Sequence, residues 1–111
     1  MKNIFHFVDG KDFNGESKRL ADVFNPATGE VQAKVSLASK SDVGSAIKVA
    51  SKAFPAWADT PPITRARILF KFKELIEKNS DELTKLIVAE HGKVYEDAKG
   101  SLTRGLEVVE F

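Results

Sequence analysis

The sequence contains no cysteine, which excludes disulfides, thiolate metal ligands and a cysteine nucleophile within its 111 residues. It also has no apolar run near the roughly 20 residues that a bilayer-crossing helix needs, and its first residues are too few for a signal peptide. We therefore expect a cytoplasmic protein without a membrane partner. Lysine and arginine total 17 against 16 aspartates and glutamates, so the net charge of +1 gives no field that would gather nucleic acid.

Histidine is also scarce, and neither His6 nor His91 has a carboxylate at metal-ligand spacing on a shared helix face. We expect no metal site, and His91 fits better as a residue of the last turn of a helix, where an imidazolium favours the negative end of the dipole. The seven glycines never assemble into a phosphate-cradling loop of either nucleotide-binding type. The sequence therefore predicts no catalytic and no cofactor-binding residue inside this chain.

The residues that are present predict an α/β fold, with N-terminal β-hairpins over residues 1–38 followed by about four helices over residues 39–111. Strand-forming side chains surround the turn pair Asp9-Gly10, which predicts a first hairpin. A second hairpin is indicated by the apolar run 20–24 and by the strict alternation of apolar and polar residues over 31–36.

The first predicted helix begins after Ser39, where Ser39 or Ser41 is the candidate N-cap. Its apolar residues recur at offsets of three and four, so we expect Trp57 to pack in a core rather than to stack on a ring ligand. Prolines at Pro55 and at 61–62 are expected to interrupt the helix. The apolar stripe consists of Val43, Ala46, Ile47, Ala50, Ala53, Phe54 and Trp57.

A second helix is expected from about Ile63, carrying a basic cluster that we interpret as a solvated face rather than a phosphate site. Asn79 should end it and cap a third helix, with Glu82 completing a capping box. Gly92 is a suitable left-handed terminator for that third helix, and a fourth begins near Tyr95. The basic cluster consists of Arg65, Arg67, Lys71 and Lys73.

The fourth helix shows two apolar stripes, and a helix that is apolar on two sides is normally interior to a larger structure. The chain ends at Phe111 without a cap or a polar tail, so we expect a truncated protein. Arg104 shares one stripe with Val108 and Phe111, and a guanidinium on a half-apolar surface usually has an anionic partner. From the pattern alone, a protein carboxylate is favoured over a carboxylate-bearing ligand.

Four segments in order, DVFNPATGEVQAKVSLAS, AFPAWADTPPITRARILFKFKELI, EHGKVYEDAKG and RGLEVVEF, resemble the start of an aldehyde dehydrogenase. The later segments look most like the methylmalonate-semialdehyde, CoA-acylating branch. The resemblance implies a protein of several hundred residues that forms dimers or tetramers, binds NAD and uses coenzyme A as co-substrate. It also implies that the nucleophilic cysteine and the cofactor loops are absent from these residues.

One site residue is carried over from the resemblance, because the helix containing RGLEVVEF is similar to a helix that lines the aldehyde entry tunnel. Arg104 matches its arginine, which in the family holds the carboxylate of malonate or methylmalonate semialdehyde. Three hypotheses follow for the chain. It is part of an NAD-dependent semialdehyde dehydrogenase and inactive alone, a free-standing helical interaction module, or a decoy that pairs with a full-length enzyme.

Overall fold

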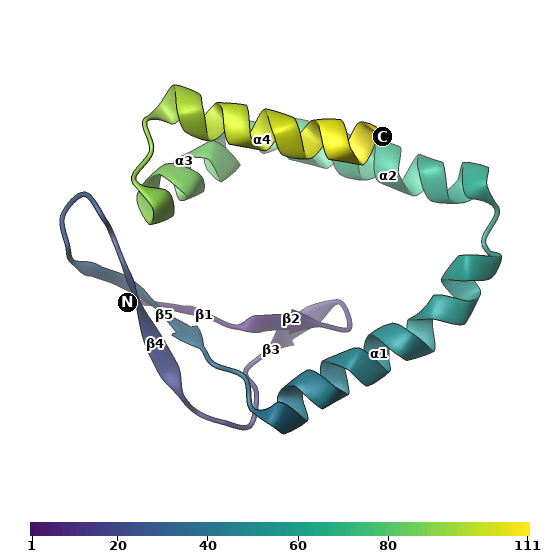
Figure 1. Ribbon diagram of the computed structural model, residues 1–111, viewed down its shortest axis with the longest axis horizontal. Helices are drawn as coiled ribbons and strands as arrows, with labels where there is room; N and C mark the ends of the chain where they lie inside the picture. The colour runs from purple at the N-terminus through teal and green to yellow at the C-terminus, as the bar shows by residue number, and fades with distance from the viewer. The chain divides into compact units, whose positions relative to one another are not determined.

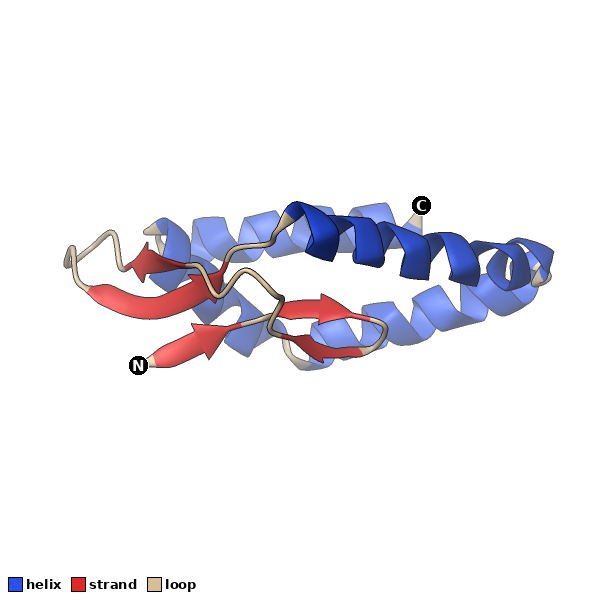
Figure 2. Ribbon diagram, turned by 90° about the horizontal axis from the view of Figure 1, so that it is seen from below, coloured by secondary structure: helices blue, strands red, loops and turns tan.

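The computed structural model describes all 111 residues, which form two compact units. The first unit comprises Met1–Phe24 and Gly29–Asp59, and the second comprises Asn25–Thr28 and Thr60–Phe111. The strands all belong to the first unit, together with one helix, while the second contains three helices (Figure 1, Figure 2). The elements are β1 (Lys2–Ile4), β2 (His6–Val8), β3 (Lys11–Phe13), β4 (Leu20–Phe24), β5 (Val31–Ser36), α1 (Lys40–Asp59), α2 (Pro62–Lys78), α3 (Ser80–His91) and α4 (Tyr95–Glu110).

Both predicted hairpins are confirmed. Strands β2 and β3 pair antiparallel around Asp9 and Gly10, whose positive φ angles of 55° and 74° give the twist that a two-residue hairpin turn requires. Strands β4 and β5 also pair antiparallel, with an irregularity at Val23 and Phe24. The pairing of β1 parallel to β5 was not predicted. Parallel neighbours are joined by long connections, so no local turn signal announces them.

Helix α1 begins at Lys40, and of the two predicted caps it is Ser39 whose Oγ accepts a hydrogen bond from the Asp42 backbone N–H at 3.0 Å. The expected interruption at Pro55 is wrong, because the helix continues through it to Asp59. A proline removes one hydrogen bond of the helix and leaves the others in place. The Pro61-Pro62 pair does end α1, and Pro62 opens α2 in the first-turn position that proline tolerates.

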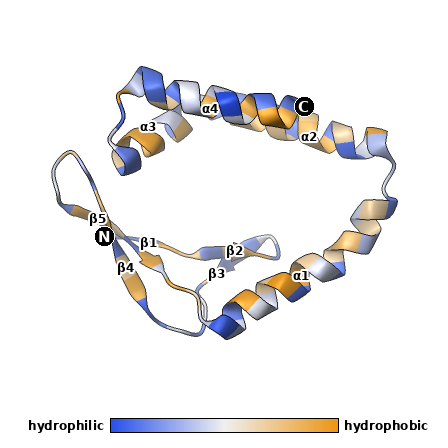
Figure 3. Cartoon of the chain, viewed as in Figure 1, coloured by the Kyte–Doolittle hydropathy of each residue, from blue (hydrophilic) through white to orange (hydrophobic).

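The expected burial of the α1 stripe is also wrong. Trp57 is 40% exposed and Phe54 is 66% exposed. No strand or helix packs extensively against α1, so its apolar side has nothing in the first unit to cover it. Figure 3 shows apolar residues recurring along this helix.

The second unit is held together by the packing of α4 against α3 and α2. Ala98 of α4 and Thr84 of α3 are fully buried at 0% exposure. The Thr84 hydroxyl donates a hydrogen bond to the Ser80 carbonyl at 2.7 Å. The core is small, and Leu86 of α3 is 43% exposed.

The junction between α2 and α3 corrects another prediction. Asn79 does end one helix and begin the next, but its side-chain amide donates to the Leu75 carbonyl at 2.7 Å rather than capping α3. The predicted capping box with Glu82 is therefore wrong, because the Asn79 side chain is already bonded to the preceding turn. Gly92 does terminate α3, in the left-handed conformation with φ of 82°.

Candidate functional site

Helix α4 carries the one residue that the sequence singled out, Arg104. Glu96 and Asp97 lie in its first turn, where negative charge favours the helix dipole, and no side chain caps its start. Ala98 fixes its inner side against the rest of the second unit. The helix is thus anchored along one side only, and Arg104 does not lie on that side.

The surroundings of Arg104 contradict the expected internal salt bridge. Arg104 is exposed, and none of the ion pairs in the structure includes it. The guanidinium lies over the preceding turn, with Nη1 3.8 Å from the place that a Cβ on Gly100 would occupy. Val108 on the same face is 76% exposed. The result is an unpaired cation beside apolar surface, which is suited to bind a carboxylate through two parallel N–H bonds.

An apolar pocket of about 330 Å³ lies between α2, α3 and α4, and two residues within two positions of Arg104 line it. These are Gly105, which presents no side chain, and Leu102. At the same wall, Lys93 donates from Nζ to the Ser101 hydroxyl at 2.8 Å. The pocket is lined by Phe72, Ile76, Ile87, Ser101, Leu102, Gly105, Leu106 and Val109.

In the basic cluster on α2, both lysines form ion pairs and Arg67 is exposed, in agreement with the prediction of a solvated surface, whereas Arg65 is half-buried. Lys71 contacts Glu74 at 3.0 Å, and Lys73 contacts Glu77 at 3.4 Å and Glu110 of α4 at 3.3 Å. Hydrogen bonding, first to Glu110 and then to Glu77, raises the pKa of Lys73 above its usual value. Lys71 is thus paired within α2, and Lys73 joins α2 to α4. The side chain of Arg65 differs, since its Nε is buried without a partner.

The two histidines differ in secondary structure and in their surroundings. His91 falls in the last turn of α3, as predicted. His6 lies on β2 beside Phe13, with ring centroids 6.1 Å apart, and its Nε2 is buried without a hydrogen-bond partner. No group of three or more His, Asp or Glu side chains in the chain is arranged to hold a metal ion.

The sequence reading missed Asp42 as the most connected polar side chain of the first unit. It is only 4% exposed, and it accepts hydrogen bonds from the backbone N–H groups of Ser39 at 2.8 Å and Glu16 at 3.0 Å. The Ser39 backbone N–H is the first cause of the lowered pKa of Asp42. A serine followed three residues later by an acid was the available signal, because this spacing forms a reciprocal cap.

Asp42 also ties the loop after β3 to the start of α1. Ser41 donates to Glu16 Oε2 at 2.8 Å, and Arg19 donates from Nη2 to the Ala38 carbonyl at 3.0 Å. Gly15 passes so close that an added Cβ would lie 3.0 Å from Asp42 Oδ2 and 3.3 Å from His6 Nε2. This cluster has a structural role, because the Asp42 carboxylate oxygens already accept hydrogen bonds from backbone N–H groups.

Comparisons with known proteins agree with one another. The sequence model of the aldehyde dehydrogenase family matches residues 13–111. A malonate-semialdehyde dehydrogenase of Pseudomonas aeruginosa is 48% identical over 111 residues, which are 100% of this chain and 22% of that protein. A methylmalonate-semialdehyde/malonate-semialdehyde dehydrogenase [acylating] of Mus musculus mitochondria is 41% identical over 104 residues, covering 94% of this chain and 19% of that protein.

Solved structures match equally well. The methylmalonate-semialdehyde dehydrogenase of Oceanimonas doudoroffii is 49% identical with a TM-score of 0.94, covering 99% of this chain and 22% of that one. A Sinorhizobium meliloti protein assigned to the same activity and complexed with NAD is 50% identical with a TM-score of 0.97, covering 100% of this chain and 23% of that one. This chain therefore spans about a fifth of the length of the relatives it matches.

Proposed function

This chain belongs to the aldehyde dehydrogenase family, and from that membership we propose that it serves as the N-terminal part of an NAD-dependent, CoA-acylating (methyl)malonate-semialdehyde dehydrogenase. The observation that carries the proposal is the match of nearly the whole chain to semialdehyde dehydrogenases at 41% to 50% identity. The longer protein would oxidise a semialdehyde to an acyl-CoA in the cytoplasm, as a homodimer or homotetramer. A free-standing interaction module gains no support from these relatives.

The residues of this chain do not suit NAD or coenzyme A. Its glycines form no phosphate-cradling loop, and the pocket of the second unit is lined almost entirely by apolar side chains. There is no cysteine to form an acyl-enzyme. Cofactor binding and group transfer would therefore depend on polypeptide outside these 111 residues, and the contribution of this part would be scaffold plus one substrate contact.

We assign that substrate contact to Arg104. A malonate or methylmalonate semialdehyde carries a carboxylate at the end opposite its aldehyde, and a guanidinium can hold it by two N–H bonds while the aldehyde carbon stays free to react. The structure favours this role over a structural one, because the guanidinium has no carboxylate partner in the chain and lies beside exposed apolar surface. An arginine that served as a tie within this chain would be paired here.

The test is a chimera in which this chain replaces the matched region of the Pseudomonas aeruginosa relative. Arg104→Leu should lower kcat/KM for malonate semialdehyde by about 2 to 4 kcal/mol of transition-state stabilisation, because the guanidinium–carboxylate contact would be lost, and should change propanal oxidation little. Arg104→Lys should recover part of the loss, since it keeps the charge without the bidentate fork. Arg67→Leu on α2 is the matched control. Equal losses on both aldehydes would assign Arg104 to structure instead.

A further inference from the structure

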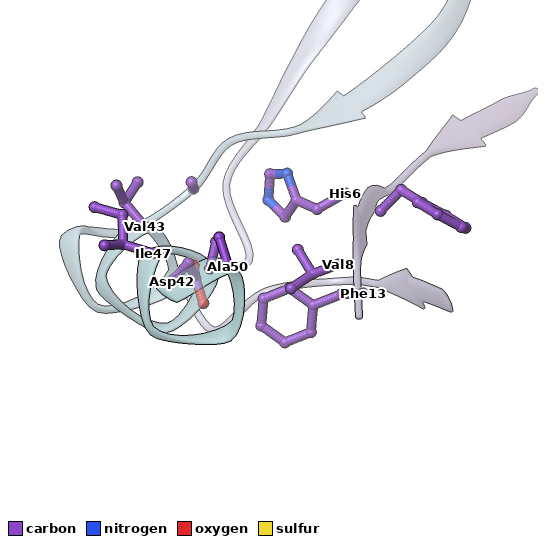
Figure 4. Close-up of a pocket in the computed structure, with 10 residues that line it drawn as sticks. His6, Val8, Phe13, Asp42, Val43, Ile47 and Ala50 are labelled. Atoms are coloured by element: carbon purple, nitrogen blue, oxygen red, sulfur yellow. The ribbon is translucent and has the colours of Figure 1, made fainter. Parts of the chain in front are cut away.

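Two of the seven glycines, Gly15 and Gly100, lie close to a charged side chain, within 4 Å of the Cβ that each would carry. At Gly15 the charged group is Asp42, which lines the pocket drawn in Figure 4 and already accepts hydrogen bonds from the backbone. At Gly100 the charged group is the guanidinium of Arg104, whose Nη1 lies at 3.8 Å and which forms no ion pair. Gly100 is therefore the glycine beside a free cation.

Neither the backbone nor helix packing requires a glycine at position 100. Gly100 lies inside α4 without a positive φ, and in such a position glycine weakens a helix relative to alanine. At 3.6 residues per turn, Gly100 also lies about 160° around α4 from the buried Ala98, so it does not face the core of the second unit. The feature that a missing side chain does explain is the space beside Arg104.

The geometry of an α-helix places the Arg104 side chain over this glycine. Side chains on a helix lean toward its N-terminus, and residues four apart share a face, so the side chain of Arg104 extends back over position 100. The separation of 3.8 Å is an ordinary van der Waals contact, so a methyl group fits at position 100. A longer side chain would cover the helix surface on which the guanidinium lies and would raise the guanidinium away from the helix.

We propose that Gly100 is a positioning residue for Arg104 that sets how far the guanidinium stands from α4, an inference that rests on the proposed function. In a malonate or methylmalonate semialdehyde a single carbon atom separates the carboxylate from the aldehyde carbon. A displaced guanidinium therefore displaces the reacting carbon as well, and small misplacements of a reacting carbon are costly. A small residue at position 100 thus favours a substrate with a nearby carboxylate.

The experiment uses the chimera with the Pseudomonas aeruginosa relative and four single variants. Gly100→Leu adds a long side chain, Gly100→Ala adds only a methyl group, and Gly100→Gln is a long, polar alternative in case leucine destabilises the chimera. Thr103→Leu is the control, because Thr103 is an exposed residue of α4 about 100° around the helix from Arg104. Each change is also combined with Arg104→Leu. Values of kcat/KM for malonate semialdehyde and propanal are measured together with the unfolding midpoint.

Gly100→Leu and Gly100→Gln should lower kcat/KM for malonate semialdehyde by about tenfold to a hundredfold and leave propanal oxidation and the midpoint almost unchanged. Gly100→Ala and Thr103→Leu should change either aldehyde by no more than about threefold. Once Arg104 is replaced by leucine, the Gly100 changes should cause no further loss, because no guanidinium remains to be displaced.

Three results would overturn the positioning role of Gly100 while leaving that of Arg104 intact. They are equal losses on both aldehydes, an unchanged kcat/KM for malonate semialdehyde in Gly100→Leu and Gly100→Gln, and losses that simply add to that of Arg104→Leu. A different result marks failure of the proposed substrate contact itself. If Arg104→Leu alone affected both aldehydes equally, Arg104 would be structural and the role of Gly100 would fall with it.

Discussion

Helices α1 and α4 are both amphipathic, yet only α4 packs extensively against other helices. Ala98 on the inner stripe of α4 is fully buried, whereas Ala50 and Ile47 on the stripe of α1 are exposed. Most helical stability in proteins comes from packing an apolar face, so a helix without such packing is weakly stabilised. The comparison shows that amphipathicity fixes which face of a helix needs a partner and leaves open whether the partner is present.

The largest expected effect comes from replacing an alanine with aspartate on the apolar stripe of each helix. Ala98→Asp buries an unpaired charge at a position with 0% exposure, so it should destabilise the second unit by at least about 3 kcal/mol. Ala50→Asp on exposed α1 should cost far less. Tyr95 is the only tyrosine and lies in the second unit, so its fluorescence during urea unfolding reports on that unit. Similar costs at both positions would remove the distinction between the two helices.

Glycines with positive φ give a second, smaller test. Gly92 has φ of 82°, and a Cβ there would lie 2.9 Å from Pro26 Cγ, so Gly92→Ala should cost about 1 to 2 kcal/mol or more of second-unit stability. Gly29 has φ of 76° but nothing within 4 Å of its added Cβ. Gly29→Ala should therefore lose only the stability that the strained backbone at positive φ costs. Urea midpoints should separate the two variants, and a Gly29 loss equal to that of Gly92 would contradict the Pro26 contact.

Acid should weaken both units, each through its own carboxylate. The Ser39 N–H lowers the pKa of Asp42, and Lys85 first and then Tyr95 lower the pKa of Asp81. A carboxyl group with a lowered pKa in the folded state stabilises the fold at pH above its unfolded value of about 3.8, and that stability is lost as the pH falls through the folded pKa.

Asp42→Asn should accordingly remove the acid dependence of the first unit and leave that of the second. Trp57 is the only tryptophan and reports on the first unit, while Tyr95 reports on the second. Fluorescence titrations below pH 5 measure the two responses in one sample. If Asp42→Asn left the tryptophan response unchanged, the Asp42 cluster would not be what holds the start of α1.

The sequence was informative where the controlling interactions are local. The turn at Asp9-Gly10, the cap at Ser39 and the terminator at Gly92 each depend on a few adjacent residues, and all three were predicted, Ser39 as one of two candidates. The errors arise where the partner lies far along the chain or where two local hydrogen bonds compete. The parallel pairing of β1 with β5 depends on a partner far along the chain, and the Asn79 side chain bonds back to Leu75 instead of forward.

The candidate site divides in the same way. The apolar setting of Arg104 followed from spacing on one helix, because residues four apart share a face. The missing salt bridge did not, since a partner for a guanidinium depends on which carboxylates the tertiary fold brings near. Sequence pattern thus located the cation, and only the structure showed that it is unpaired.

The smallest expected effect is the most direct measure of the difference between the two helices. Phe54→Ala removes a large aromatic side chain that is 66% exposed on α1, and in the 111-residue chain it should change the free energy of unfolding by no more than about 0.5 kcal/mol. A buried phenylalanine would cost about 3 to 5 kcal/mol on the same truncation. Denaturation followed at Trp57 tests the value. A loss above about 2 kcal/mol would mean that Phe54 is covered in solution, and that α1 is not the unsupported helix that the structure describes.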